Sequence, residues 1–129
     1  MATEILPHLM FDGDAKQAML LYVELFPDSE IIESTEYTSG ENKGKLQFGR
    51  FSLNGRTFNC IDSPVKHDFD FTPAFSIFVN CESVDELSTL FKTLAEGGQI
   101  HMPLDNYGFS QQFGWLQDRF GVSWQLNFP

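Results

Sequence analysis

Apolar residues follow two different spacings along this chain, and the change of spacing divides it into two similar halves. Apolar residues in short runs or at every second position are typical of strands, whereas apolar residues three or four positions apart are typical of a helix. Each half begins with one strand-like run, continues with one helical stretch and ends with three strand-like runs. The pattern therefore predicts the order strand, helix, three strands twice in succession.

In the first half, Asp14 is placed to cap the N-terminus of the helix, and Pro27 ends the helix because its ring cannot continue one. Asn54-Gly55 is a strong signal for a hairpin turn between two strands. The elements predicted here are strands at residues 5–11, 29–38, 45–53 and 56–62, and a helix at 15–26.

The second half follows a polar segment, residues 63–72, which we interpret as a linker. Ser83 and Glu86 have the spacing of a capping box, so a helix is predicted to begin after Ser83, and Gly97-Gly98 ends it. The strands predicted around this helix lie at residues 74–80, 99–103, 110–117 and 122–128.

Both halves close on the same short motif. A glycine turn, at Gly55 and at Gly121, is followed by an aromatic residue three positions on and a carboxamide four positions on. We therefore predict a single α+β domain of two βαβββ modules, residues 1–62 and 73–129, with mostly antiparallel sheets. One helix can cover only one face of its sheet, so the two open faces are expected to curl toward one another around a ligand-binding cleft.

Composition narrows the function classes. The net charge is −10 over 129 residues, which disfavours nucleic acid and anionic membranes as partners. The N-terminus has no basic stretch followed by an apolar run, and no apolar segment is long enough to cross a membrane, so a cytoplasmic location is predicted.

The two cysteines, Cys60 and Cys81, lie in strand-like contexts and are interpreted as reduced, buried thiols of a cytosolic protein. A zinc site is not predicted, because neither cysteine has a CxxC-type spacing. A nucleophilic role for Cys60 is the alternative, but it needs a nearby cation, and the neighbouring Asp62 opposes a thiolate. Asp62 itself is interpreted as a solvated turn carboxylate, with a general base as the alternative.

Two segments carry a family resemblance: Phe11–Ala15 with the helical residues Ala18, Tyr22 and Phe26, and the longer segment Gly114–Gln125. On these residues the chain resembles the PhnB-like branch of the vicinal oxygen chelate superfamily, which has the glyoxalase and bleomycin-resistance fold. The resemblance implies paired βαβββ modules and a homodimer. Members of the branch often carry the label 3-demethylubiquinone-9 3-methyltransferase, but the sequence lacks the glycine-rich strand-to-helix turn that S-adenosylmethionine binding usually needs.

The resemblance also implies a divalent metal held by side chains of the first, fourth, fifth and eighth strands. Counting from the turn glycines and the helix aromatics places these positions at Pro7, Asn59, Ser76 and Gln125. None of these is a strong ligand, so no metal cofactor is predicted. His8 is a weak candidate, because a shift of one residue sends a strand side chain to the opposite face. His67 and His101 are predicted to be solvated.

These observations favour a protein that binds a small organic molecule in the cleft, as the bleomycin-binding members of the superfamily do without a metal. Asn59, Ser76 and Gln125 are the candidate hydrogen-bonding anchors, and Trp115 is a candidate apolar wall. Arg50 would hold an anionic group if its side chain faces the cleft, and would otherwise pair with a surface acid. Two alternatives remain: a metal-dependent lyase, isomerase or dioxygenase, and a module that uses its fold only to dimerise.

Overall fold

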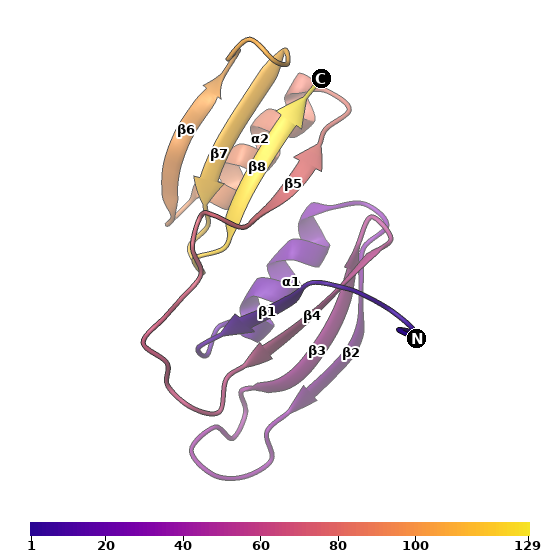
Figure 1. Cartoon of the computed structure of the whole chain (residues 1–129), viewed down its shortest axis with the longest axis vertical. Helices are drawn as coiled ribbons and strands as arrows, with labels where there is room; N and C mark the ends of the chain where they lie inside the picture. Colours follow the sequence, from indigo (N-terminus) through magenta and orange to yellow (C-terminus); the bar gives the residue numbers. More distant parts are fainter. The chain divides into compact units, whose positions relative to one another are not determined.

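The computed structural model describes the whole chain, residues 1–129, as two compact units, Met1–Asp68 and Phe69–Pro129. The boundary between the units falls within the predicted linker. Each unit contains one helix and one four-stranded sheet, and the order strand, helix, three strands occurs twice (Figure 1). The predicted α+β fold class is confirmed.

In the first unit the sheet has the strand order β1-β4-β3-β2. The neighbouring strands β1 and β4, which are the first and last strands of the unit in the sequence, run parallel. The pairs β4–β3 and β3–β2 are antiparallel. The sheet is therefore mixed, with mostly antiparallel pairs. Its elements are β1 (His8–Phe11), α1 (Ala15–Leu25), β2 (Glu30–Glu36), β3 (Leu46–Leu53) and β4 (Arg56–Asp62).

The second unit repeats this topology with the strand order β5-β8-β7-β6. β5 and β8 are the parallel pair, and the other two pairs are antiparallel. Its elements are β5 (Ser76–Asn80), α2 (Val84–Ala95), β6 (Gln99–Asp105), β7 (Gln112–Gln117) and β8 (Ser123–Phe128).

The predicted strands differ from the observed ones mainly at their ends. β1 and β5 begin at His8 and Ser76, later than predicted, whereas β6 continues past Pro103 to Asp105. Proline removes a backbone donor and is tolerated in a strand at a sheet edge or a bulge. β6 is an edge strand whose pairing with β7 shifts register on both sides of Met102, so Pro103 does not end it.

Each helix packs on one face of its own sheet, as Figure 1 shows for α2 against β5–β8. In the first unit core side chains come close to the backbone at Gly49 of β3. A Cβ atom there would lie 2.7 Å from Leu46 Cδ2 and 3.0 Å from both Cys60 Sγ and Met19 Sδ. In the second unit a Cβ atom on Gly114 of β7 would lie 2.5 Å from the Phe91 ring of α2. One glycine in each sheet thus lets the core side chains reach the strand backbone.

A buried carboxylate organises the start of α1. Asp62, at the end of β4, is fully buried, and its Oδ1 accepts hydrogen bonds from Gly13 N at 2.8 Å and Ala15 N at 3.0 Å. Its Oδ2 accepts from Leu46 N at 2.9 Å, so one side chain joins the helix to β3 and β4. Asp14 occupies the N-cap position, but its side chain makes no capping hydrogen bond. The prediction that Asp62 is a solvated turn carboxylate is therefore wrong.

The start of α2 agrees better with the sequence. Ser83 Oγ accepts a hydrogen bond from Glu86 N at 3.1 Å, as the capping box predicts. The Glu86 carboxylate in turn accepts from Glu82 N at 2.9 Å, one residue before the position expected for a capping box. Two backbone donors at this helix end are thus paired with side chains.

We expect Asp62→Asn to lower the free energy of unfolding by about 2–4 kcal/mol, because an amide nitrogen would face backbone N–H groups that now donate to a carboxylate. The matched control is Asp14→Asn, whose exposed side chain makes no capping bond, with an expected change within about 0.5 kcal/mol. Urea denaturation followed by circular dichroism measures both. A larger loss for Asp14→Asn than for Asp62→Asn would contradict this account of the helix start.

Candidate functional site

The predicted anchors of the second unit lie on the open face of its sheet, the face opposite α2. Successive strand residues point to opposite faces, and Trp124, which is fully buried, lies on the helix side. Gln125 therefore points to the open face, and its antiparallel partner Trp115 shares that face. Ser76 joins them because it pairs with Ser123, two residues before Gln125 on the same strand.

Hydrogen bonds connect these side chains directly. Trp115 Nε1 donates to Ser123 Oγ at 2.8 Å, and Ser123 Oγ lies 2.6 Å from Ser76 Oγ. Gln125 Nε2 donates to Ser76 Oγ at 3.2 Å. We call Ser76, Trp115, Ser123 and Gln125 the polar cluster. Ser123 was not predicted, although its position two residues before Gln125 is the signal that could have identified it.

The polar cluster retains unused hydrogen-bonding capacity. Each serine hydroxyl has one proton, and the bond between Ser76 and Ser123 uses only one of the two. Gln125 uses one of its two amide hydrogens, and its Oε1 accepts no hydrogen bond. The cluster can therefore offer a bound molecule a hydroxyl donor, an amide donor and an amide acceptor, without any formal charge.

In the first unit the candidate residues form one row across the open face. Asn59 of β4 pairs with His8 of β1 on one side and with Arg50 of β3 on the other. Paired residues of neighbouring strands point to the same face, so all three side chains lie together. The position predicted for Pro7 is thus held by His8, and the sequence count was wrong by one residue. Pro7 contributes only its carbonyl oxygen, which accepts from Asn59 N at 2.9 Å.

Arg50 takes the second of the two roles considered for it, pairing with a surface acid. It lies on the open face, and its Nη2 also donates to Glu4 Oε2 at 2.5 Å. This bond to Glu4 raises the pKa of the Arg50 guanidinium. Glu33 lies opposite Arg50 on β2 and its charge adds a weaker attraction, so the guanidinium is already paired with the Glu4 carboxylate. The row therefore does not present an unpaired positive charge to an anionic ligand.

The donor set does not fit the divalent metal that the resemblance implies. In neither unit do three His, Cys, Asp or Glu side chains gather in a geometry that could hold an ion. The four implied positions present one imidazole, two carboxamides and one hydroxyl, and the three neutral oxygen groups are weak ligands for a transition metal. The side chains at these positions therefore do not form a suitable site for a divalent transition metal.

The other two histidines make different contacts. His67 is exposed in the linker, and its Nε2 lies 2.9 Å from Ser63 Oγ. His101, on β6, packs against Trp115 with 5.0 Å between the ring centroids, and its Nε2 is buried without a hydrogen-bond partner. The prediction that His101 is solvated is wrong, because its ring packs on Trp115 and its Nε2 is buried; His101 lies at the register shift between Ile100 and Met102.

Both cysteines are buried, and the pKa of each thiol is raised. Burial, reinforced by the Asp62 carboxylate, raises the pKa of the Cys60 thiol to about 12. Burial, together with Glu86, raises the pKa of the Cys81 thiol to about 11. The interpretation of both residues as buried thiols is confirmed, and neither has the lowered pKa that a nucleophile needs.

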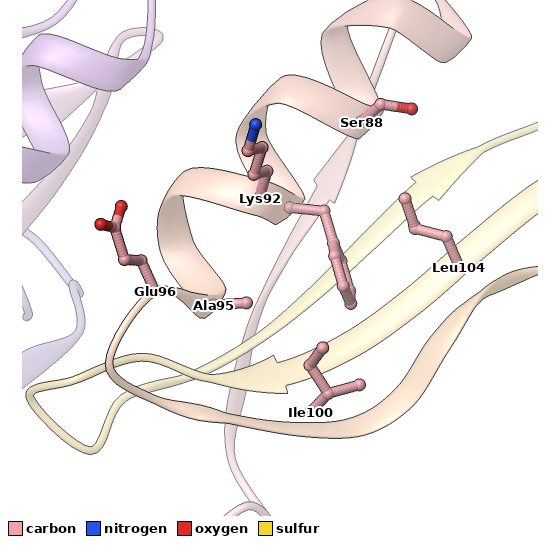
Figure 2. Close-up of a pocket in the computed structure, with 7 residues that line it drawn as sticks. Ser88, Lys92, Ala95, Glu96, Ile100 and Leu104 are labelled. Carbon is pink, nitrogen blue, oxygen red and sulfur yellow. The ribbon is translucent and has the colours of Figure 1, made fainter.

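A separate groove lies on the helix side of the second unit, between α2 and β6 (Figure 2). It has a volume of about 520 Å³, with Ile100 and Leu104 of β6 on one side. Lys92 and Glu96 of α2 stand at its rim and project away from these two apolar side chains in Figure 2. No sequence pattern predicted this groove, and the polar residues around it form no hydrogen-bonded constellation.

The chain also matches a known protein family over almost its whole length. The sequence pattern of the family described as 3-demethylubiquinone-9 3-methyltransferase matches residues 3–127. The chain belongs to this family. It is similar to the PhnB protein of Bacillus cereus, which carries the same methyltransferase name, with 46% identity over 98% of this chain and 100% of that one and a TM-score of 0.95.

Two other solved structures are also similar to this member of the methyltransferase-named family. Protein PA1353 from Pseudomonas aeruginosa has 28% identity, covers 98% of both chains and has a TM-score of 0.82. FosX from Listeria monocytogenes, a fosfomycin resistance protein solved with Mn(II), has 14% identity, covers 100% of this chain and 94% of its own, and has a TM-score of 0.62. This last likeness shows the glyoxalase and bleomycin-resistance fold alone. No curated protein matches the chain.

We expect the thiols of this family member to react slowly with a disulfide reagent at pH 8. A pKa raised from 9.0 to about 11 or about 12 keeps the thiol protonated and lowers the thiolate fraction about a hundredfold or more. The measurement compares the reaction rate of the native chain with that of the chain unfolded in urea. Cys81→Ser isolates Cys60, and rapid reaction of this native variant would contradict the buried, inert assignment.

Proposed function

We propose that the protein binds a small, neutral organic molecule at the polar cluster, without the help of a metal ion. The observation that carries the proposal is the chain of hydrogen bonds from Trp115 through Ser123 and Ser76 to Gln125. These bonds hold the side chains in place before a ligand arrives, which lowers the entropy cost of binding. The unused donors and acceptor then select the ligand's polar groups.

The absence of charge in the polar cluster supports a neutral ligand. A charged group moved from water to a half-buried surface loses solvation, and only a partner of opposite charge offsets that loss. Ser76 and Gln125 offer hydroxyl and amide groups, and Trp115 adds an apolar wall. Pockets that bind small molecules commonly combine an apolar lining with a few placed polar groups.

The methyltransferase name of the family does not fit the helix starts. Binding of S-adenosylmethionine usually uses free backbone N–H groups at a glycine-rich turn between a strand and a helix. At the turn before α1, the N–H groups of Gly13 and Ala15 donate to Asp62 instead. At the turn before α2, the N–H of Glu86 donates to Ser83. We therefore propose binding rather than methyl transfer.

A metal-dependent lyase, isomerase or dioxygenase is the second candidate, and one observation favours it. His8 lies in register with Asn59 on the open face, so an imidazole is available where the sequence count had placed Pro7. A single imidazole is too few ligands for tight metal binding, and this ranks the candidate second.

The remaining predictions concern partners and location. None of the helices is long and apolar enough to cross a lipid bilayer. The homodimer, the cytoplasmic location and the lack of nucleic-acid or membrane partners stay predictions from the sequence.

We expect neutral fragments to shift the NMR signals of the Trp115 indole and the Gln125 amide in the ¹⁵N-labelled protein. Gln125→Leu should weaken the binding of the best fragment about fivefold to tenfold, because it removes two hydrogen-bonding groups. Gln111→Leu, at an exposed position whose amide bonds only the Pro129 carbonyl, is the matched control and should leave affinity unchanged. A library in which no fragment shifts these signals would exclude the proposed site.

We expect the protein to retain less than about 0.1 ion per chain after incubation with Zn²⁺, Ni²⁺ or Mn²⁺ and desalting, since one imidazole beside neutral amides binds these ions weakly. Elemental analysis of the native chain and of His8→Ala provides the measurement. Retention of about one ion per native chain that His8→Ala abolishes would replace the first candidate by the metal-dependent enzyme.

A further inference from the structure

Four aromatic rings gather beside the polar cluster on the open face of the second sheet. Phe113 of β7 is buried beneath the other three. Its ring centroid lies 5.0 Å from that of Phe109, 6.1 Å from that of Tyr107 and 6.4 Å from that of Phe78. We call these four residues the aromatic shelf.

The upper rings of the shelf are exposed to an unusual degree. Phe109 is 64% exposed, Phe78 is 53% exposed and Tyr107 is 37% exposed. Large apolar side chains that gather on a surface mark an interaction site far more often than scattered ones do. Within the second unit these three rings are largely uncovered, so the shelf can accept an apolar partner.

The loop that carries two of these rings is held in shape by its own hydrogen bonds. The Tyr107 hydroxyl donates to the Pro103 carbonyl oxygen at 2.5 Å, and Gly108 N donates to Asn106 Oδ1 at 2.8 Å. The rings of Tyr107 and Phe109 stack with 6.4 Å between centroids and 17° between their planes. Ordered rings cost less entropy on binding than mobile ones.

The shelf is continuous with the polar cluster. Phe78 pairs with Gln125 across β5 and β8, and Phe113 lies two residues before Trp115 on β7, so both point to the same face as the cluster. On its other side lies an amide pair in which Asn127 Nδ2 donates to Asn80 Oδ1 at 2.9 Å. Asn127 is only 9% exposed, and its Oδ1 has no hydrogen-bond partner.

We propose that the aromatic shelf binds a planar aromatic ring of the small molecule, while the polar cluster binds the oxygen or nitrogen substituents of that ring. This inference rests on the proposed function and names the class of its ligand. Aromatic rings prefer offset-stacked or edge-to-face contacts, and the tilted and edge-on rings around Phe113 offer both.

A small ring explains the shelf better than a second copy of the chain. The exposed rings are bounded by hydrogen-bonding amides, with Gln125 on one side and the Asn80–Asn127 pair on the other. These amides lie within the span of a few strand residues, which is the size of a substituted ring. A protein partner would instead have to leave the unused groups of Gln125 without ligand contacts in the middle of its interface.

The test compares two matched probes, 4-methoxyphenol and its saturated counterpart 4-methoxycyclohexanol, which carry the same substituents. Each is titrated into the ¹⁵N-labelled full chain while the signals of β5, β7, β8 and the Trp115 indole are followed. We expect the aromatic probe to bind about threefold to tenfold more tightly than the saturated one. Phe109→Leu should abolish most of that preference, because it keeps apolar surface but removes the π-system.

Phe75→Leu is the matched control, since Phe75 is 63% exposed and belongs to none of the ring contacts of the shelf. Equal affinities of the two probes for the native chain, with shifts at Trp115 and Gln125, would overturn the aromatic inference and leave the proposed function intact. No shifts from either probe would overturn the aromatic inference, and the proposed function would fail with it only if no other neutral fragment shifts the Trp115 and Gln125 signals.

Sedimentation velocity of Phe109→Leu tests the remaining possibility, that the shelf is a contact between two copies of the chain. If this variant changes the oligomeric state and leaves the preference between the two probes unaltered, the shelf is a contact between chains and the proposal is wrong. An unchanged sedimentation coefficient together with loss of the aromatic preference supports the ring-binding assignment.

Discussion

The one-sided covering of each sheet by a single helix is the constraint on which the rest of the structure depends. It leaves each sheet with one face toward the core and one open face, and β8 shows the resulting alternation with buried Trp124 beside half-buried Gln125. The core face is closed by close packing at Gly49 and Gly114. The open face is free of that packing requirement, so polar and aromatic groups can collect there without disturbing the fold.

Much of this arrangement could be predicted from local sequence signals. The repeat of glycine, aromatic and carboxamide in the two halves placed Asn59 and Gln125 at the same point of two hairpins, and the structure places both on open faces. Trp115 and Gln125 were both predicted as site residues, and the structure pairs them across β7 and β8, which a short turn joins. These signals succeed because hairpins join residues that are near one another in the sequence.

Contacts between distant segments were harder to predict. The first and fourth strands pair in parallel about fifty residues apart in the chain, and no turn sets their register. The count back from the helix aromatic Tyr22 contains no information on that register, and it selected Pro7, whereas His8 is the residue in register with Asn59. Asp62 was misread for a similar reason. Its three backbone partners come from the α1 turn and from β3, and nothing beside it in the sequence shows that it is enclosed.

Two buried aspartates, one in each unit, bear on chemistry as well as folding. Asp62 takes the N–H groups at the start of α1, and in the second unit Asp118 accepts from Phe120 N, Val122 N and Trp124 Nε1. The buried carboxylates of Asp62 and Asp118 thus accept hydrogen bonds from backbone and indole donors in the core, away from the open faces. The polar cluster and the aromatic shelf on the open face of the second unit are built from neutral groups: hydroxyls, a carboxamide, an indole, a phenol and phenyl rings. A surface of that composition recognises a molecule by shape, stacking and hydrogen bonds, and it has little to offer an ion.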